Sequence, residues 1–295
     1  MRISECIKKA NRPFLSLEFF PPSDEKQLPQ FEQNLSKLEK LEPLFVSVTY
    51  GAGGARQHNT LALTADLAKR GLIVMAHLTC VGASKDSIAS FLKELREANV
   101  QNILALRGDA PKDKVWDWQS GDFKHAIDLV RFTRKIEANM DIGVAAYPTP
   151  HPESISFADD RRHTAEKLRS GATFAITQLF FDVREYEELT RTLHDHGNCS
   201  PVIPGILPIQ SFDSLRRILS LCGTNIPGKL YLDLEKANDA GGIEAVREVG
   251  LKFAINQIRT LIDMGAPGIH LYTLNRAELC LQLADEVGFK KCKIG

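Results

Sequence analysis

Short runs of β-branched and aromatic residues alternate along the chain with longer segments whose apolar residues recur every three or four positions. Runs of the first kind predict strands. They occur at Phe14–Phe20, Phe45–Tyr50, Ile73–Thr79, Ile103–Arg107, Ile142–Tyr147, Phe174–Phe181, Val202–Leu207 and Gly268–Leu274.

The segments between these strands have helical spacing. Two examples are Phe31, Leu35, Leu38 and Leu41, and Ile88, Phe91, Leu92 and Leu95. Glycines at Gly71, Gly171 and Gly265 fall where a helix should stop before the next strand. Ser84, Asp86 and Ser211 are expected to cap helix N-termini.

Eight strands that each lead into a helix predict a single-domain (β/α)₈ TIM barrel, with residues 1–295 as one domain. The competing fold is a doubly wound open sheet, whose dinucleotide-binding form needs GxGxxG after the first strand. Here the first strand runs into Phe19-Phe20-Pro21-Pro22, which cannot form that loop. The long segment from Ile226 to Asp263 predicts an extra helix before the last strand.

Composition and charge narrow the class of protein. The 295 residues are 43% hydrophobic and 25% charged, which excludes a disordered chain and a collagen-like fibre. The 37 basic and 37 acidic residues balance, so neither nucleic acid nor an anionic membrane is an expected partner. The first twenty residues lack the apolar core of a signal peptide, and the six cysteines are scattered. We therefore expect a cytoplasmic protein with reduced thiols.

Polar and ring-bearing residues lie at the carboxyl ends of most predicted strands. In a TIM barrel these ends and the loops after them meet at one mouth, where barrel enzymes carry out their chemistry. The residues concerned are Glu18, Thr49, Tyr50, His77, Thr79, Arg107, Gly108, Asp109, Tyr147, His151, Gln178, Tyr272 and Asn275.

Glu18 is the sharpest single candidate. Alternation along the first strand places Leu15 and Leu17 under the helices and turns Ser16 and Glu18 into the barrel. A carboxyl group there loses hydration, which favours its protonated form and suits a general acid. The structural alternative, equally compatible with the sequence, is a buried glutamate paired with an arginine or lysine.

Some other motifs can be interpreted in two ways, and others argue against a nucleotide-binding loop or a metal site. Arg107-Gly108-Asp109 fits either a backbone that approaches a ligand, with an arginine to grip phosphate, or a turn with an internal salt bridge. Trp116 and Trp118 either cover a site or fold back onto the surface. The glycine-rich run at 51–54 matches no nucleotide-binding fingerprint, and no histidine pattern predicts a metal site.

Several strings, in order along the chain, resemble the bacterial methylenetetrahydrofolate reductases from about Phe14 to Glu278. They are Leu17-Glu18-Phe19-Phe20-Pro21-Pro22, Val46-Ser47-Val48-Thr49-Tyr50-Gly51-Ala52, Ala76-His77-Leu78-Thr79, Leu104-Ala105-Leu106-Arg107-Gly108-Asp109, Ala145-Ala146-Tyr147-Pro148, Ile176-Thr177-Gln178, Pro204-Gly205-Ile206-Leu207-Pro208 and Tyr272-Thr273-Leu274-Asn275-Arg276.

The resemblance implies a barrel that holds FAD noncovalently and reduces methylenetetrahydrofolate to 5-methyltetrahydrofolate with NADH or NADPH, for methionine synthesis. By the same resemblance Glu18 and Asp109 are catalytic: Glu18 donates the proton that opens the folate ring, and Asp109 contacts the pterin and tunes the flavin. The substrate-binding residues it implies are Asp109, Gln178, Phe212, Tyr272 and Arg276. A homo-oligomer is expected from the family.

The cofactor-binding residues follow in the same way. They are Thr49, Tyr50, Ala52, His77, Arg107, Gly108, Asp109, Ala126, Tyr147, His151, Asp160, His163 and Lys167. Two departures from the family pattern, Thr149-Pro150 and His163, bear on flavin affinity or geometry. Since the chain stops at Gly295, the S-adenosylmethionine-sensing domain of eukaryotic relatives is not expected.

Two other functions remain as alternatives. One is a pterin-binding barrel that transfers a one-carbon unit without a redox step, which would have no use for contacts to adenosine and diphosphate. The other is a noncatalytic flavin- or folate-binding subunit, against which the combination of Glu18, Asp109 and Gln178 argues.

Overall fold

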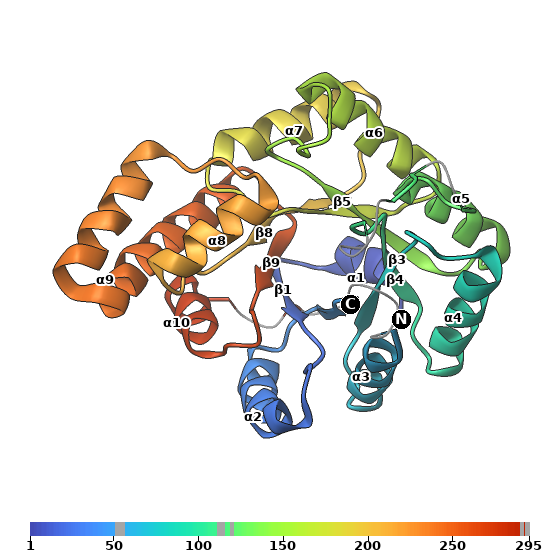
Figure 1. Ribbon diagram of the computed structural model, residues 1–295, viewed down its shortest axis with the longest axis horizontal. Helices are drawn as coiled ribbons and strands as arrows, with labels where there is room; N and C mark the ends of the chain where they lie inside the picture. The colour runs from blue at the N-terminus through green and yellow to red at the C-terminus, as the bar shows by residue number, and fades with distance from the viewer. Residues whose placement is uncertain (51–56, 111–115, 119–120, 290–291, 293–295) are drawn as a thin grey trace.

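The computed structural model describes residues 1–50, 57–110, 116–118, 121–289 and 292. Within these residues nine parallel strands form one sheet, in the order β7-β6-β5-β4-β3-β2-β1-β9-β8, and helices surround it (Figure 1). The strands are β1 Phe14–Phe19, β2 Phe45–Val48, β3 Val74–Thr79, β4 Asn102–Leu106, β5 Asp141–Ala146, β6 Phe174–Thr177, β7 Val202–Ile203, β8 Gly205–Ile206 and β9 Gly268–Tyr272. The predicted barrel is thereby confirmed.

Helices follow the strands in the expected alternation. They are α1 Ile3–Lys9, α2 Leu28–Leu38, α3 Gln57–Lys69, α4 Lys85–Glu97, α5 Ala126–Ile136, α6 Phe157–Arg169, α7 Val183–Asp195, α8 Phe212–Cys222, α9 Gly228–Asp263 and α10 Glu278–Val287, with short 3₁₀ turns at Glu25–Gln27 and Glu39–Leu41. The predicted extra helix before the last strand is α9, which bends at Gly242, where φ is 63°.

The predicted seventh strand is divided in two by Pro204. The first part, β7, pairs with β6, whereas the second part, β8, pairs with β9. The proline has no amide hydrogen to contribute to the sheet, but its carbonyl accepts a hydrogen bond from the amide of His270 at 2.9 Å. One segment therefore connects the two ends of the sheet, and this connection closes the barrel.

Three clusters of buried apolar side chains form the core of the described residues, one of them where α8 and α9 pack together. The largest lies between the strands and the surrounding helices and includes Leu15, Leu17 and Phe19, as alternation along β1 predicts. A smaller cluster fills the barrel interior, where α1 contributes Ile3 and Cys6. The amide of Ile3 donates to Asn102 Oδ1 at 2.9 Å, which holds α1 against the amino ends of the strands. The site is therefore left at the opposite, carboxyl ends.

Element boundaries depart from the predictions at a few positions. The sixth strand ends at Thr177 rather than Phe181, so Gln178 is the first residue after it. Ser84 and Ser211 cap α4 and α8 as predicted, but Asp86 is not a cap and lies in the first turn of α4. An apolar run cannot show where pairing stops, because buried loops are as apolar as buried strands.

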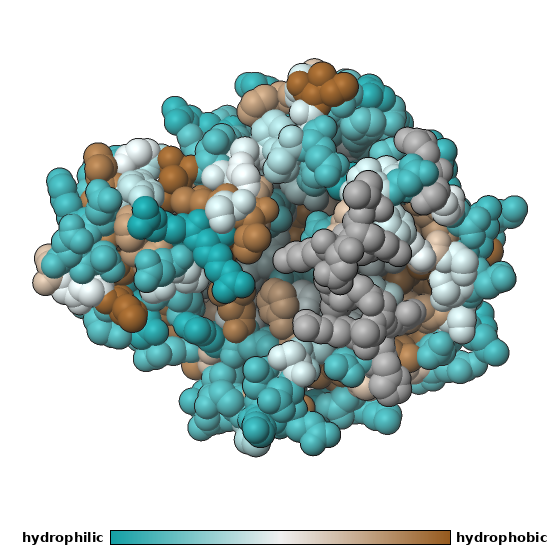
Figure 2. All heavy atoms as spheres, in the orientation of Figure 1, coloured by the Kyte–Doolittle hydropathy of each residue, from teal (hydrophilic) through white to brown (hydrophobic). Residues whose placement is uncertain are grey.

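The outer surface is mostly hydrophilic in the view of Figure 2, with apolar side chains exposed in places. Large exposed apolar residues include Leu221 in α8 and Leu232 in α9. Among the helices that are described, none combines the length and the apolar character needed to cross a bilayer.

Candidate active site

A cavity of about 440 Å³ opens at the carboxyl ends of the strands. It brings together most of the residues that the sequence singled out, although these are far apart along the chain. Those that line it are Glu18, Thr49, Tyr50, His77, Thr79, Arg107, Gly108, Asp109, Tyr147, His151, Gln178 and Tyr272. The predicted convergence on one mouth is confirmed.

Glu18 lines this cavity, which we call the central cavity, and only 6% of its surface is exposed. Its carboxylate oxygen Oε2 is 3.4 Å from Nε2 of His77 and 3.7 Å from Nε2 of His270. Among the described residues these two histidines, rather than an arginine or lysine, are the ionisable partners of Glu18. Within the described residues the structural alternative, a Glu–Arg or Glu–Lys pair, therefore has no cation to form it.

The histidine nearer to Glu18 is held in its neutral form. Loss of hydration lowers the pKa of His77 to about 4, although the Glu18 carboxylate acts in the opposite direction. Its Nε2 atom is buried and has no hydrogen-bond partner among the described residues. A buried polar atom without a partner calls for a functional explanation, and this one faces the acid.

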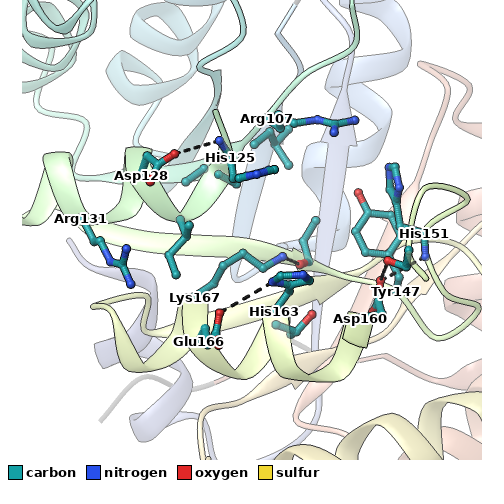
Figure 3. Close-up of a pocket in the computed structure, with 17 residues that line it drawn as sticks. Arg107, His125, Asp128, Arg131, Tyr147, His151, Asp160, His163, Glu166 and Lys167 are labelled. Carbon is teal, nitrogen blue, oxygen red and sulfur yellow. Dashed lines mark hydrogen bonds and ion pairs between the residues drawn. The ribbon is translucent and has the colours of Figure 1, made fainter. Parts of the chain in front are cut away.

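A second cavity, of about 420 Å³, lies beside the first between β4, β5, α5 and α6 (Figure 3). We call it the lateral groove. It shares Arg107, Tyr147 and His151 with the central cavity, so the two form one elongated site. Predicted cofactor-binding residues that line only the groove are Ala126, Asp160, His163 and Lys167.

Lys167 brings a buried ammonium group to the lateral groove. Its Nζ donates to the carbonyl of Ala145 at 2.6 Å, and no carboxylate of the described residues lies within 4 Å of it. Loss of hydration lowers the pKa of Lys167 to about 8, opposed in part by Asp160. A buried ammonium group without a carboxylate partner among the described residues is stabilised more by an anionic ligand than one that is already in an ion pair.

The junction of the two cavities is built by the loop after β5. The rings of Tyr147 and His151 meet edge to face with centroids 5.0 Å apart. Asp160 Oδ2 accepts hydrogen bonds from the His151 amide and from Ser154 Oγ, both at 3.1 Å. Desolvation raises the pKa of Tyr147 to about 12 and lowers the pKa of His151, so both rings are neutral near pH 7.

Arg107 connects the loops after β4 and β5. Its Nη1 donates to Glu153 Oε2 at 2.6 Å, and its guanidinium lies 4.0 Å from the ring centroid of Trp118. Trp118 therefore lies against a residue that lines both cavities, and Trp116 packs beside Gly82. The ion pair of Arg107 with Glu153 joins two loops. It is not the salt bridge within Arg107-Gly108-Asp109 that the interpretation of this tripeptide as a turn required.

Position 108 requires a glycine, both because of its backbone conformation and because of the side chains next to it. Its φ is +86°, and a Cβ atom there would lie 2.8 Å from Val81 and 2.9 Å from Thr79. The close approach that glycine permits is thus to the loop after β3. It sets the position of Asp109, whose exposed side chain lines the mouth.

The predicted residues that lie elsewhere come mainly from helices and outer loops. Phe212, at the start of α8, is buried against Tyr231, and Arg276 lines a different hollow between α2 and α10. His163 borders the lateral groove, but 55% of its side chain is exposed and it pairs with Asp159. Ala52 lies outside the described residues. The roles assigned to these four residues remain predictions.

Two residues that sequence reasoning missed organise the site. His270 points inward beside Glu18, and alternation back from Tyr272 could have placed it there. Arg161, in α6, is fully buried. It bonds to the carbonyls of Tyr147 and Pro148 and to Glu188 Oε2, which fixes the loop after β5. An arginine in a helix is usually exposed, so the sequence did not indicate that Arg161 is buried and holds the loop after β5.

Thr149, one of the two departures from the family pattern, also ties that loop down. Its hydroxyl donates to Glu185 Oε2 of α7 at 2.8 Å, and Asn225 Nδ2 donates to the other oxygen of the same carboxylate at 3.0 Å. The departure therefore has a structural partner of its own.

Within the described residues no group of three or more His, Cys, Asp or Glu side chains is arranged to hold a metal ion.

Fold and site together define a class: a (β/α)₈-barrel enzyme with a buried acid in its central cavity and a charged groove beside it. Comparison with known proteins narrows this class. Residues 2–288 match the family model described as methylenetetrahydrofolate reductase, and the chain belongs to that family. It is thereby an oxidoreductase of tetrahydrofolate-linked one-carbon metabolism.

Similar proteins include bacterial and eukaryotic members. The 5,10-methylenetetrahydrofolate reductase of Salmonella typhimurium is 34% identical over 279 residues, which cover 94% of this chain and 91% of the relative. The probable methylenetetrahydrofolate reductase (NADPH) of Caenorhabditis elegans is also 34% identical, over 98% of this chain. The match spans only 44% of that longer relative.

A solved structure supports the fold. An uncharacterized protein from Clostridium thermocellum, described as binding two copies of 5-methyl-5,6,7,8-tetrahydrofolic acid, superposes with a TM-score of 0.69. The match covers 97% of this chain and 98% of that one, at 13% sequence identity. At this identity the likeness concerns the barrel architecture alone.

Proposed function

We propose that this chain reduces 5,10-methylenetetrahydrofolate to 5-methyltetrahydrofolate, with noncovalently bound FAD and with NADH or NADPH as electron donor. The observation that carries the proposal is the buried carboxyl group of Glu18, which lines a cavity that shares wall residues with the lateral groove. The product would supply methyl groups for methionine synthesis.

The two connected cavities fit an elongated cofactor with a planar ring system and a diphosphate. Lys167 offers a cation without a carboxylate partner, and Ala126 brings the N-terminal end of α5 to the same groove. Tyr147 and His151 would hold the part of the ligand at the junction. Bound there, FAD would supply the capacity to take a hydride from one substrate and give it to the other.

The residues of the central cavity have distinct roles in this proposal. Glu18 would protonate N10 of the folate, which opens the five-membered ring, and its burial would limit the access of water to that step. Gln178 Oε1 accepts a hydrogen bond from the Leu179 amide at 2.9 Å, so its NH₂ group is left to donate to a ligand. Asp109 at the mouth would contact the pterin.

The nicotinamide and the folate would use the central cavity in turn, as a ping-pong mechanism requires. The folate-binding description of the Clostridium thermocellum barrel supports a folate substrate for this fold. Family membership supports the flavin and the nicotinamide donor. The same family forms the basis for expecting a homo-oligomer.

An anaerobic visible spectrum of the purified protein tests the proposal. A yellow protein that bleaches with NADH or NADPH, and recovers its colour on addition of methylenetetrahydrofolate, supports both half-reactions. A yellow protein that ignores both donors would contradict the donor assignment. A colourless protein that stays so after incubation with FAD would overturn the reductase and favour one-carbon transfer without redox chemistry.

A further inference from the structure

One carboxylate joins the loop after β5 to the segment between α8 and α9, residues 223–227, which we call the α8–α9 connector. Glu185, in the first turn of α7, lines neither the central cavity nor the lateral groove. Its Oε2 atom accepts a hydrogen bond from the hydroxyl of Thr149 at 2.8 Å, and its Oε1 atom accepts one from Nδ2 of Asn225 at 3.0 Å. Thr149 belongs to the loop and Asn225 to the connector, so one side chain holds two separate segments.

The connector makes two further contacts with the barrel. Thr224 is only 8% exposed, and its Oγ1 atom donates to the carbonyl of Leu179, just after β6, at 3.2 Å. The φ of Gly223 is +62°, and a Cβ atom there would lie 2.8 Å from Cγ of Pro152 in the loop after β5. The connector therefore packs directly on this loop, and Glu185 ties together two segments that are already in contact.

The loop after β5 is the wall that the two cavities share, because Tyr147 and His151 line both of them. Arg161 holds the start of this loop at two backbone carbonyls. The residues that follow are attached elsewhere, through Thr149 to α7 and through Pro152 to the connector. These two attachments flank His151 in the sequence, so they constrain where its ring lies.

Each of the two hydrogen bonds to Glu185 restricts the side chain for the other. A charged acceptor binds a donor more strongly than a neutral one does, but a free glutamate loses rotamer entropy when it is fixed. With one oxygen already held, the second bond forms at a smaller entropic cost. Removal of either donor lets the carboxylate rotate and weakens the bond that remains. A change in the connector is therefore transmitted to the loop.

We propose that Glu185 is a positioning residue for the cofactor. By joining the loop after β5 to the α8–α9 connector, it holds Tyr147 and His151 in place at the junction of the two cavities before a ligand arrives. For the identity of that ligand, FAD, the inference rests on the proposed function. A wall that is ordered in advance does not have to be ordered on binding, so the affinity for the cofactor depends on this link.

The first test is hydrogen–deuterium exchange of the ligand-free protein, followed at the amides of His151 and Ser154, which are hydrogen-bonded to Asp160 Oδ2 and to the His151 carbonyl. Thr149→Val removes the hydroxyl and keeps the shape of the side chain. It should accelerate exchange of both amides roughly three- to thirtyfold, whereas Thr149→Ser, which keeps the donor, should restore the wild-type rates. Wild-type rates in Thr149→Val overturn the inference.

Asn225→Leu tests the link from its other end. This change lies in the connector, yet it should accelerate exchange of the same loop amides. Once Thr149 no longer reaches Glu185, the amide of Asn225 can no longer act on the loop through that carboxylate, so Asn225→Leu should add little to Thr149→Val in the double variant. Loop amides that ignore Asn225→Leu, or effects that multiply in the double variant, contradict a link through Glu185.

The second test is the affinity for FAD, measured by the change in flavin fluorescence on binding to the ligand-free protein. Thr149→Val and Asn225→Leu should each weaken FAD binding roughly three- to thirtyfold, and Thr149→Ser should bind as the wild type does. Thr190→Val is the matched control, because Thr190 also lies in α7 but its hydroxyl bonds only to carbonyls of its own helix, those of Tyr186 and Glu187.

The two tests separate two kinds of failure. If the wild-type protein does not bind FAD, the proposed function loses its cofactor, while the exchange rates still decide whether Glu185 holds the loop. If the wild type binds FAD and both Thr149→Val and Asn225→Leu bind it equally well, the positioning role of Glu185 is wrong and the proposed function stands.

Discussion

His77 Nε2 lies 3.4 Å from Glu18 Oε2, and both side chains are only 8% exposed. Desolvation keeps this imidazole neutral near pH 7, so it is not a cationic partner of the carboxyl group. The pair therefore differs from a structural ion pair, which would hold two opposite charges, and this difference is what the proposed catalytic role of Glu18 requires.

Glu18→Gln keeps the shape of this pair and removes its acid. Positioned acid catalysis typically contributes about 10²–10⁴-fold, so folate reduction should slow by that order. Reduction of the flavin by NADH or NADPH needs no ring opening and should persist. Stopped-flow measurement of each half-reaction checks this, with the exposed Glu248→Gln in α9 as control. An equal loss in both half-reactions would make Glu18 structural.

His77 makes stability depend on pH. Its pKa is about 4 in the folded protein and near 6.5 when unfolded, so the unfolded chain binds more protons between these values. The free energy of unfolding should therefore fall as the pH is lowered from about 6.5 to about 4. Urea titrations across this range should show a smaller fall for His77→Gln. The exposed His194→Gln should keep the wild-type dependence, and identical slopes in all three proteins would refute the assignment.

Lys167 makes anion binding in the lateral groove depend on pH. Its pKa is lowered to about 8, and an anion binds best to the charged form. The affinity for ADP, measured by calorimetry, should decline as the pH rises beyond about 8. Lys167→Met should weaken ADP binding by roughly ten- to a hundredfold and abolish that decline. Lys252→Met, in exposed α9, is the control. Unchanged ADP binding by Lys167→Met would place the diphosphate elsewhere.

Gly108 and Gly121 have the same φ, +86°, but different surroundings. A Cβ atom on Gly108 would overlap Val81 and Thr79, whereas one on Gly121 would meet no atom of the described residues within 4 Å. Alanine at Gly121 should cost about 1 kcal/mol of stability through backbone strain alone. Alanine at Gly108 should cost about 1–3 kcal/mol more. Chemical denaturation measures both, and equal losses would show that the loop after β3 yields to the added methyl group.

Arg161 and Arg162 are adjacent in α6 but differ in burial. Arg161 is fully buried and Arg162 is half exposed. Arg161→Gln removes the donor to Glu188 Oε2 and to two backbone carbonyls and should cost roughly 3–5 kcal/mol, although Thr192 still donates to the other oxygen of Glu188. Arg162→Gln removes exposed pairs and should cost less than about 1 kcal/mol. Similar losses in the two variants would contradict a special role for Arg161 in fixing the loop after β5.

Period-two alternation predicted much of the site. On β1 it separated Leu17 from Glu18 correctly, because one side of each barrel strand packs on helices and the other on the interior. Parallel strands in a closed sheet then bring their carboxyl ends together whatever their order in the chain. Residues such as His77, Arg107 and Tyr147 could thus be assigned to one cavity from the sequence alone.

Alternation by itself could not decide the contacts between strands or the direction of helices. The approach of His270 to Glu18 depends on the register of β9 against β1, which no local pattern encodes. The burial of Phe212 depends on how α8 packs against α9, and the position of Arg276 depends on the turn after β9. Arg161 looks like an ordinary surface residue until the loop above it is placed.

The interruption at Pro204 leaves the segment Val202–Ile206 paired over only a short length on either side, and we call this segment the seam of the barrel. Two register pairs hold that segment to β6 and two to β9, whereas five join β1 to β9. Tyr272 spans the seam, since its hydroxyl donates to the Thr177 carbonyl at 2.6 Å. Local opening, and the earliest amide exchange in the sheet, should begin there. A ligand that contacts Tyr272 would therefore stabilise the closed barrel as well as occupy its cavity.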